Sequence, residues 1–91
     1  MMNKRLFEGT ISIYVQIELD SAVIDVVDDE WRSGLYNLRT PESIAEHIAG
    51  NLIRGARLSM LDGWADQPDG NARIVNEDWR FDWMDEILEV E

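Results

Sequence analysis

The sequence contains no cysteine, which excludes disulfide bonds, zinc–thiolate sites, iron–sulfur clusters and thiol nucleophiles. Basic side chains are also scarce, because eight Lys and Arg residues stand against nineteen carboxylates and give a formal net charge of -11. Nucleic acids and anionic membranes attract proteins through clusters of Lys and Arg. The composition therefore predicts no direct nucleic-acid binding and no membrane binding.

Long apolar runs are absent as well. Lys4 and Arg5 near the N-terminus are followed by residues 10–20, in which apolar and polar side chains alternate. We therefore expect neither a signal peptide nor a transmembrane span, and a cytoplasmic location. The sequence also lacks a phosphate-binding loop and a glycine-rich dinucleotide motif, so no cofactor is predicted.

The chain does have enough apolar residues for one domain, residues 1–91, because 45% of its side chains are hydrophobic. Four tryptophans can each bury a large area, which matters in so small a core: Trp31, Trp64, Trp79 and Trp83. A chain of this length has modest stability. A monomer is therefore feasible, and a dimer would stabilise it further.

Residues 7–19 show the clearest strand pattern. Their apolar side chains fall at every second position, namely Ile11, Ile13, Val15, Ile17 and Leu19. Strict alternation of this kind predicts a half-buried β-strand. Gly9, near the start of the strand, indicates a bulge or a close approach of another backbone.

Two helices are predicted in the middle of the chain. Asp20 and Ser21 are N-cap candidates for a short helix over residues 22–31, although its β-branched residues leave a strand over 22–27 as the alternative. The tripeptide 40–42, Thr-Pro-Glu, starts the main amphipathic helix, residues 41–54 with a possible extension to 60. Gly50 and Gly55 suggest that this helix packs closely against the sheet.

The C-terminal third is predicted to be a loop followed by strands. Residues 61–70 contain turn signals, residues 72–75 form a short strand, and a further strand runs through Trp83 with a bulge near Asp85. A helix over residues 77–91 is the alternative. The predicted fold class is α+β, a small antiparallel sheet of about three strands packed against one main amphipathic helix.

The aromatic residues have two interpretations. Trp79, Phe81 and Trp83 on one strand face are expected to pack as core against the main helix, and Trp31 is expected in the core. Trp64 lies in an acid-flanked loop, which is the composition of an interface hot spot. It fits equally well as a core residue beneath that loop.

The acidic residues are concentrated in two blocks. Six carboxylates lie between Glu18 and Glu30 without a basic residue, and seven lie between Glu77 and Glu91 with only Arg80. Strand carboxylates at i, i+2 are about 6.6 Å apart, close to twice the spacing of about 3.4 Å between phosphates along a DNA strand. The blocks therefore suggest a phosphate mimic; solvated surface is the alternative. The predicted partner-binding residues are Asp25, Asp28, Asp29, Glu30, Asp82, Asp85, Glu86 and Glu89, with Trp64 as an aromatic anchor.

No catalytic or metal site is predicted. The run 28–30 and the loop acids Asp62, Asp66 and Asp69 do not match the spacing of a calcium-binding loop. His47, the single histidine, is expected on the surface of the main helix. Its possible partner Ser43 lies one turn away, a spacing that is common in helices without any catalytic meaning. We therefore expect a protein that is not an enzyme.

In size, acidity, lack of cysteine and its two acidic blocks, the chain resembles the small acidic accessory proteins of phages and mobile elements, including anti-CRISPR and anti-restriction inhibitors. The resemblance is one of composition and extends over the whole chain. It implies a non-enzymatic protein in the host-cell cytoplasm that inhibits a basic nucleic-acid-handling host complex by occupying its nucleic-acid site. The alternative is a small structural or assembly protein, a homodimer formed through a sheet edge or the Gly50/Gly55 helix face, whose acids serve solubility only.

Overall fold

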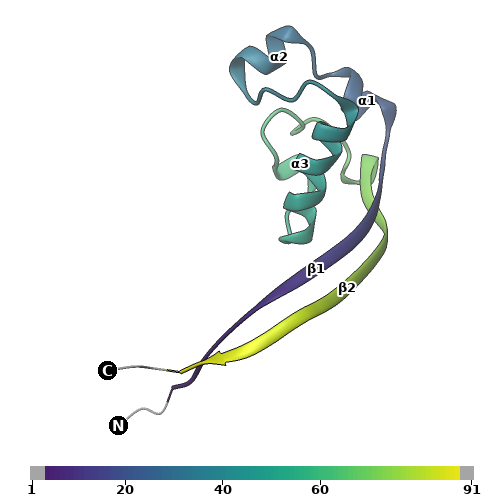
Figure 1. Cartoon of the computed structure of the whole chain (residues 1–91). Helices are drawn as coiled ribbons and strands as arrows, with labels where there is room; N and C mark the ends of the chain where they lie inside the picture. The colour runs from purple at the N-terminus through teal and green to yellow at the C-terminus, as the bar shows by residue number, and fades with distance from the viewer. Residues whose placement is uncertain (1–3, 89–91) are drawn as a thin grey trace.

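The computed structural model describes residues 4–88, which form a helical head and a long two-stranded antiparallel ribbon (Figure 1). The molecule measures 54 × 28 × 23 Å because the ribbon projects well beyond the head. Along the chain the elements are β1 (Leu6–Leu19), α1 (Ser21–Asp25), α2 (Asp29–Gly34), α3 (Pro41–Ile53), η1 (Leu58–Met60), η2 (Asp69–Asn71) and β2 (Ala72–Ile87). The α+β class is confirmed.

Strands β1 and β2 pair along their whole length, from Leu6 opposite Ile87 to Leu19 opposite Ala72. The predicted first strand is confirmed, but the prediction of about three strands is wrong within the part of the chain described. Residues 72–75 and 79–83 belong to one strand, because the intervening residues 76–78 contain no turn and pair with β1. The C-terminal segment through Ile87 is therefore strand and not helix.

A β-bulge in β2 changes which side chains share a face. Thr10 pairs with Trp83, whereas the next residue, Ile11, pairs with Phe81, so Asp82 is the extra residue. An extra residue shifts the alternation of all side chains beyond it. Trp83 therefore points to the face opposite Phe81. The prediction of one shared aromatic face is wrong, and the bulge occurs earlier in the strand than predicted.

The ribbon consequently has two chemically different faces. The apolar face carries Phe7, Gly9, Ile11, Ile13, Val15, Ile17 and Leu19 from β1 with Ala72, Ile74, Glu77, Trp79, Phe81, Met84 and Glu86 from β2. The polar face carries Leu6, Glu8, Thr10, Ser12, Tyr14, Gln16 and Glu18 with Arg73, Asn76, Asp78, Arg80, Trp83, Asp85 and Ile87. A Cβ on Gly9 would clash with the Trp83 carbonyl oxygen and would lie 2.8 Å from the end of the Met84 side chain. The predicted close approach at Gly9 is confirmed.

The predicted helix over residues 22–31 is two short helices in the structure. Asp20 caps α1, its carboxylate accepting a hydrogen bond of 2.9 Å from the Ala22 N–H. Asp28 then caps α2, and its carboxylate accepts a hydrogen bond of 2.8 Å from the Trp31 N–H. Each aspartate satisfies a backbone donor that a helix start leaves without a partner. The second cap divides the segment.

Helix α3 begins as predicted. Thr40 and Ser43 form a reciprocal capping box, and Pro41 occupies the first turn. The helix ends at Ile53 and does not extend to residue 60, because Gly55 adopts a left-handed conformation with φ of 97°.

The two glycines of this segment do not pack against the sheet. A Cβ on Gly50 or on Gly55 would have no heavy atom within 4 Å. The prediction that they allow close backbone packing is wrong. Gly55 instead terminates the helix, and Gly50 lies on its exposed face.

The hydrophobic core lies in the head and not along the ribbon. Its buried residues are Val23, Val27, Trp31, Ile44, Ile48, Leu58, Leu61, Trp64 and Ala72. Trp31 and Trp64 are in contact, with ring centroids 4.9 Å apart. The ribbon joins this core through Ile17 and Leu19 at its head end, where both side chains are half-buried. Helix α3 therefore covers only the end of the sheet, less than the sequence predicts.

Candidate functional site

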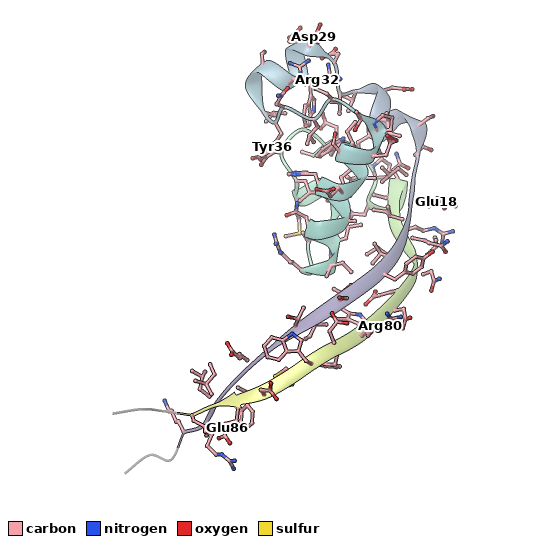
Figure 2. All side chains as sticks on the ribbon, viewed as in Figure 1. Glu18, Asp29, Arg32, Tyr36, Arg80 and Glu86 are labelled. Carbon is pink, nitrogen blue, oxygen red and sulfur yellow. The ribbon has the colours of Figure 1, made fainter. Side chains whose placement is uncertain are left out.

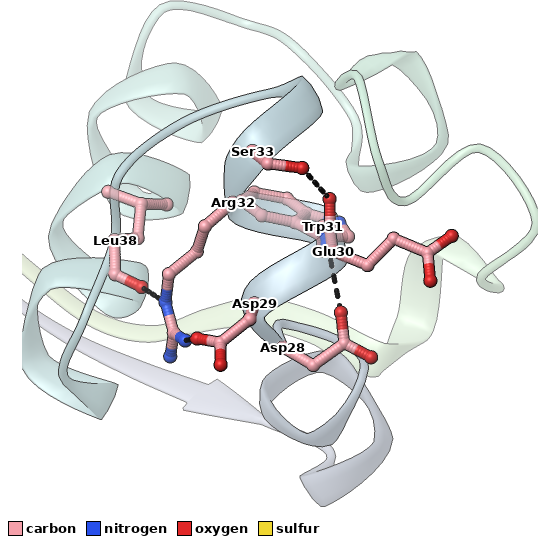
Figure 3. A network of polar contacts seen from close by, with 7 residues as sticks. All are labelled: Asp28, Asp29, Glu30, Trp31, Arg32, Ser33 and Leu38. Atoms are coloured by element: carbon pink, nitrogen blue, oxygen red, sulfur yellow. Dashed lines mark hydrogen bonds and ion pairs between the residues drawn. The ribbon is translucent and has the colours of Figure 1, made fainter.

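Four of the predicted partner-binding carboxylates lie together on the head. Asp25 ends α1. Asp28 caps α2, and Asp29 and Glu30 begin it (Figure 3). All four residues are exposed. Carboxylates in the first turn of a helix interact favourably with its N-terminal dipole. Part of this acidic cluster therefore has a local structural cause.

The polar contacts around α2 separate structural carboxylates from free ones. Asp28 is the cap, and Asp29 pairs with the Arg32 guanidinium at 3.1 Å. Arg32 also donates to the Leu38 carbonyl oxygen at 2.7 Å, which fixes the chain after the helix (Figure 3). Among the described residues, no ion pair engages the carboxylates of Asp25 and Glu30. Of the four carboxylates, these two are therefore the best candidates for binding a partner.

The remaining predicted carboxylates lie on β2. Glu86 accepts two hydrogen bonds from Arg5, at 2.6 and 2.8 Å, and this guanidinium lowers the pKa of Glu86 below its ordinary value. The carboxylate of Asp82, at the bulge, accepts a hydrogen bond of 2.5 Å from the Ser12 hydroxyl. Asp85 is exposed on the polar face. Glu89 lies outside the described residues.

The predicted carboxylates on the head lie far from those near the end of the ribbon. Asp29 lies at one end of the molecule and Glu86 at the other, along the 54 Å dimension (Figure 2). The polar face between them also carries basic residues, because Arg73 pairs with Glu18 at 3.1 Å and Arg80 follows farther along the ribbon. The blocks therefore do not form one continuous acidic surface, and β2 has no regular row of carboxylates.

Trp64 belongs to the core. Its side chain is 1% exposed, and its indole Nε1 donates a buried hydrogen bond of 3.0 Å to the Val23 carbonyl oxygen. This bond ties the loop after η1 to α1. The prediction of Trp64 as an exposed aromatic anchor is wrong, and its core alternative is confirmed, as is the core position of Trp31.

The exposed aromatic residues lie on the ribbon instead. Trp79 is 50% exposed, Phe81 68% and Trp83 46%, so the prediction that they form core against the main helix is wrong. Sequence patterns identify the strand but not this exposure. One feature of the sequence does indicate the exposure of these aromatic residues. The strands carry more large apolar side chains than one helix of 13 residues can cover.

The histidine and the serine considered as a catalytic pair both make structural contacts. His47 is half-buried, not a free surface residue, and packs against Tyr36 with ring centroids 4.5 Å apart and the two rings tilted by 45°. The Ser43 hydroxyl donates to the Thr40 carbonyl oxygen and is committed to the helix cap. Among residues 4–88, no three His, Cys, Asp or Glu side chains are placed to share a metal ion.

The loop acid Asp69 has a structural partner. Its carboxylate accepts a hydrogen bond of 3.0 Å from the Ser59 N–H, and this bond connects η2 to η1. Hydrogen bonds from Ser59 hold the pKa of Asp69 below its ordinary value, with a smaller contribution from the nearby Arg57. Hydrogen bonding that favours the charged form of a carboxyl has this effect.

Comparison of the chain with protein-family models, with curated proteins and with solved structures found no match. Within residues 4–88, none of the helices has the length and apolar character needed to cross a membrane. The functional conclusions therefore depend on two surfaces, the acidic head and the apolar face of the ribbon.

Proposed function

We propose that the protein is a non-enzymatic acidic binding protein whose head engages a basic surface on another protein. The observation that carries this proposal is the placement of four exposed carboxylates on α1 and α2 at one end of the molecule, namely Asp25, Asp28, Asp29 and Glu30. Asp25 and Glu30 are exposed, and neither is used in an ion pair among the described residues. A net charge of -11 adds long-range attraction toward a basic partner.

The proposed target is a nucleic-acid-handling complex, and the mechanism is competition with nucleic acid for a basic site. Such sites present Lys and Arg to phosphates. A carboxylate cluster on the head can occupy them by the same electrostatic attraction. Because Asp85 and Glu86 pair with Glu8 and Phe7 at the end of the ribbon away from the head, the head alone forms this proposed contact.

Affinity capture with the tagged protein from a host lysate at low salt tests the proposal. We expect recovery of a nucleic-acid-binding complex that is released by moderate salt and by added DNA or RNA. The double variant Asp25→Asn/Glu30→Gln should reduce recovery, because it removes charge without touching the Asp28 cap. The matched control, Asp78→Asn/Asp85→Asn, makes the same charge change on the ribbon and should bind normally.

Two outcomes would contradict the proposal. One is equal recovery with the head and ribbon variants. The other is an affinity that stays unchanged between about 50 and 500 mM salt, because contacts between exposed charges weaken as the Debye length falls.

A second candidate function is assembly as a homodimer. The exposed apolar face of the ribbon favours it, since Phe81 and Trp79 there remain half or more exposed. The two functions are compatible because the head and the ribbon project in different directions (Figure 1).

A further inference from the structure

Beyond the head, the large side chains on the apolar face of the ribbon are left exposed by the residues that the structure describes. Ile11 is 44% exposed, and the four larger side chains on this face are exposed to a similar or greater extent, Phe7 by 52%, Trp79 by 50%, Phe81 by 68% and Met84 by 49%. They form one continuous stripe with Ile17 and Leu19, which pack on the core. A contiguous apolar stripe on a soluble domain is typical of an interaction site.

The ribbon itself needs a cover over this face. A two-stranded antiparallel sheet is marginally stable in water, and independent stability requires further strands or a packed face. β1 and β2 pair over 14 and 16 residues respectively, yet only their head ends reach the core. A partner that is always present in equal amount satisfies this need most directly, and a second copy of the chain is such a partner.

The charge distribution favours a second copy over a basic protein at this face. Arg5 and Glu86 neutralise each other at 2.6 Å, and the Trp79 indole donates to the Glu77 carboxylate. Among the described residues of the apolar face, Glu77 is thus the single carboxylate without a basic partner, although the chain carries a net charge of -11. Two copies can meet here with little of the repulsion that their other surfaces would cause.

The available area is close to what a stable dimer needs. Three aromatic side chains, each exposing about half or more of a surface of roughly 150–250 Å², offer roughly 350 Å² of apolar area per copy, and Ile11 and Met84 add to it. With the polar rim around them, this approaches the roughly 800 Å² per partner that stable interfaces bury.

We propose that two copies pack their ribbons apolar face to apolar face around a two-fold axis. The same residues then serve on both sides, as a closed homodimer requires. The strands run in opposite directions along the interface, which keeps the two acidic heads at opposite ends of the dimer and minimises their repulsion. This dimer does not depend on the proposed function of the head, and it differs from pairing through a sheet edge.

Sedimentation equilibrium on the full chain tests the dimer with a matched pair of tryptophans. Trp79 and Trp83 lie on the same strand, with 50% and 46% exposure, but on opposite faces. We expect a wild-type dimer, a monomeric Trp79→Glu variant, and a Trp83→Glu variant that remains dimeric. A wild-type monomer up to high micromolar concentration, or equal effects of the two substitutions, would overturn the proposal.

Cross-linking decides the question if Trp79→Glu unfolds, as judged by circular dichroism. Because the chain has no cysteine, an introduced thiol is unique. With a short bis-maleimide, Ile13→Cys on the apolar face should give a covalent dimer in high yield. Ser12→Cys, its neighbour on the polar face, should give little. Similar yields from the two variants, or no covalent dimer from Ile13→Cys, would assign the face to something other than a second copy.

Discussion

The Trp31 indole occupies the space next to Gly63 that any other side chain would need. A Cβ at residue 63 would lie 2.5 Å from the Trp31 Nε1 atom, and the Gly63 carbonyl oxygen accepts a hydrogen bond of 3.3 Å from the same nitrogen. Gly63 also has φ of 95°, a conformation that L side chains rarely adopt. Two independent constraints therefore require glycine where this loop closes over the core.

Gly63→Ala is expected to destabilise the protein strongly. Backbone strain and overpacking against Trp31 together predict a loss of about 2–4 kcal/mol in the free energy of unfolding. Thermal denaturation should show a decrease in Tm of about 10 °C or more. Gly70→Ala is the control, because a Cβ there meets no atom within 4 Å. Equal Tm values for Gly63→Ala and Gly70→Ala would contradict the packing described for Trp31.

Gly50→Ala is expected to have the opposite effect. Gly50 lies within α3, and a Cβ there has no heavy atom within 4 Å. Alanine in an exposed helix interior stabilises by about 0.5–1 kcal/mol relative to glycine. Gly55→Ala also meets no atom but must adopt φ of 97°, so it should destabilise the helix end. Denaturant unfolding of both variants measures the difference, and a destabilised Gly50→Ala would show that the glycine has a packing role.

The elements that the sequence predicts correctly are those set by local chemistry. The alternation in β1 and the Thr40 cap of α3 depend on neighbours a few residues away, and both are confirmed. The continuous β2 follows from pairing with β1, a partner distant in sequence, so its segments looked like separate strands. Tertiary context of this kind overrides local strand patterns.

The candidate site could be predicted only in part for the same reason. The exposure of Asp25 and Glu30 could be predicted, because unpaired acidic side chains are rarely buried. The bulge at Asp82, which separates Phe81 from Trp83, has no distinctive residue to mark it. The position of Trp64 is decided by its hydrogen bond to Val23, 41 residues away, which no pattern in the acid-flanked loop encodes.

The structural and electrostatic roles of Asp28 can be separated by two substitutions. Its carboxylate caps α2 through the Trp31 N–H at 2.8 Å. Asp28→Ala should reduce the free energy of unfolding by about 0.5–2 kcal/mol, whereas Asp28→Asn retains a good capping residue and should change it little. Chemical denaturation of the two variants, with Asp25→Asn as a charge control, tests this. A loss in Asp28→Asn as large as that in Asp28→Ala would mean that charge, not capping, is the main contribution.

The contact between Ser59 and Asp69 predicts a specific pH dependence. Hydrogen bonds from Ser59 lower the pKa of Asp69, so folding favours its charged form. This stabilisation is fully present above the pKa of an unfolded aspartate, about 3.9. It is lost as pH falls through the lower pKa of the folded state, because protonation then ends the charged contact.

Ser59→Ala should therefore raise the pKa of Asp69 toward its ordinary value, as followed by NMR titration of the Asp69 side-chain carboxyl carbon. The shift should be partial, because the backbone N–H of residue 59 still donates to the carboxylate. Ser33→Ala is a matched control, since its hydroxyl donates to the Glu30 carbonyl oxygen on α2. An Asp69 pKa that is unchanged in Ser59→Ala would show that the hydroxyl has no part in holding η1 and η2 together, and that the backbone contact alone joins them.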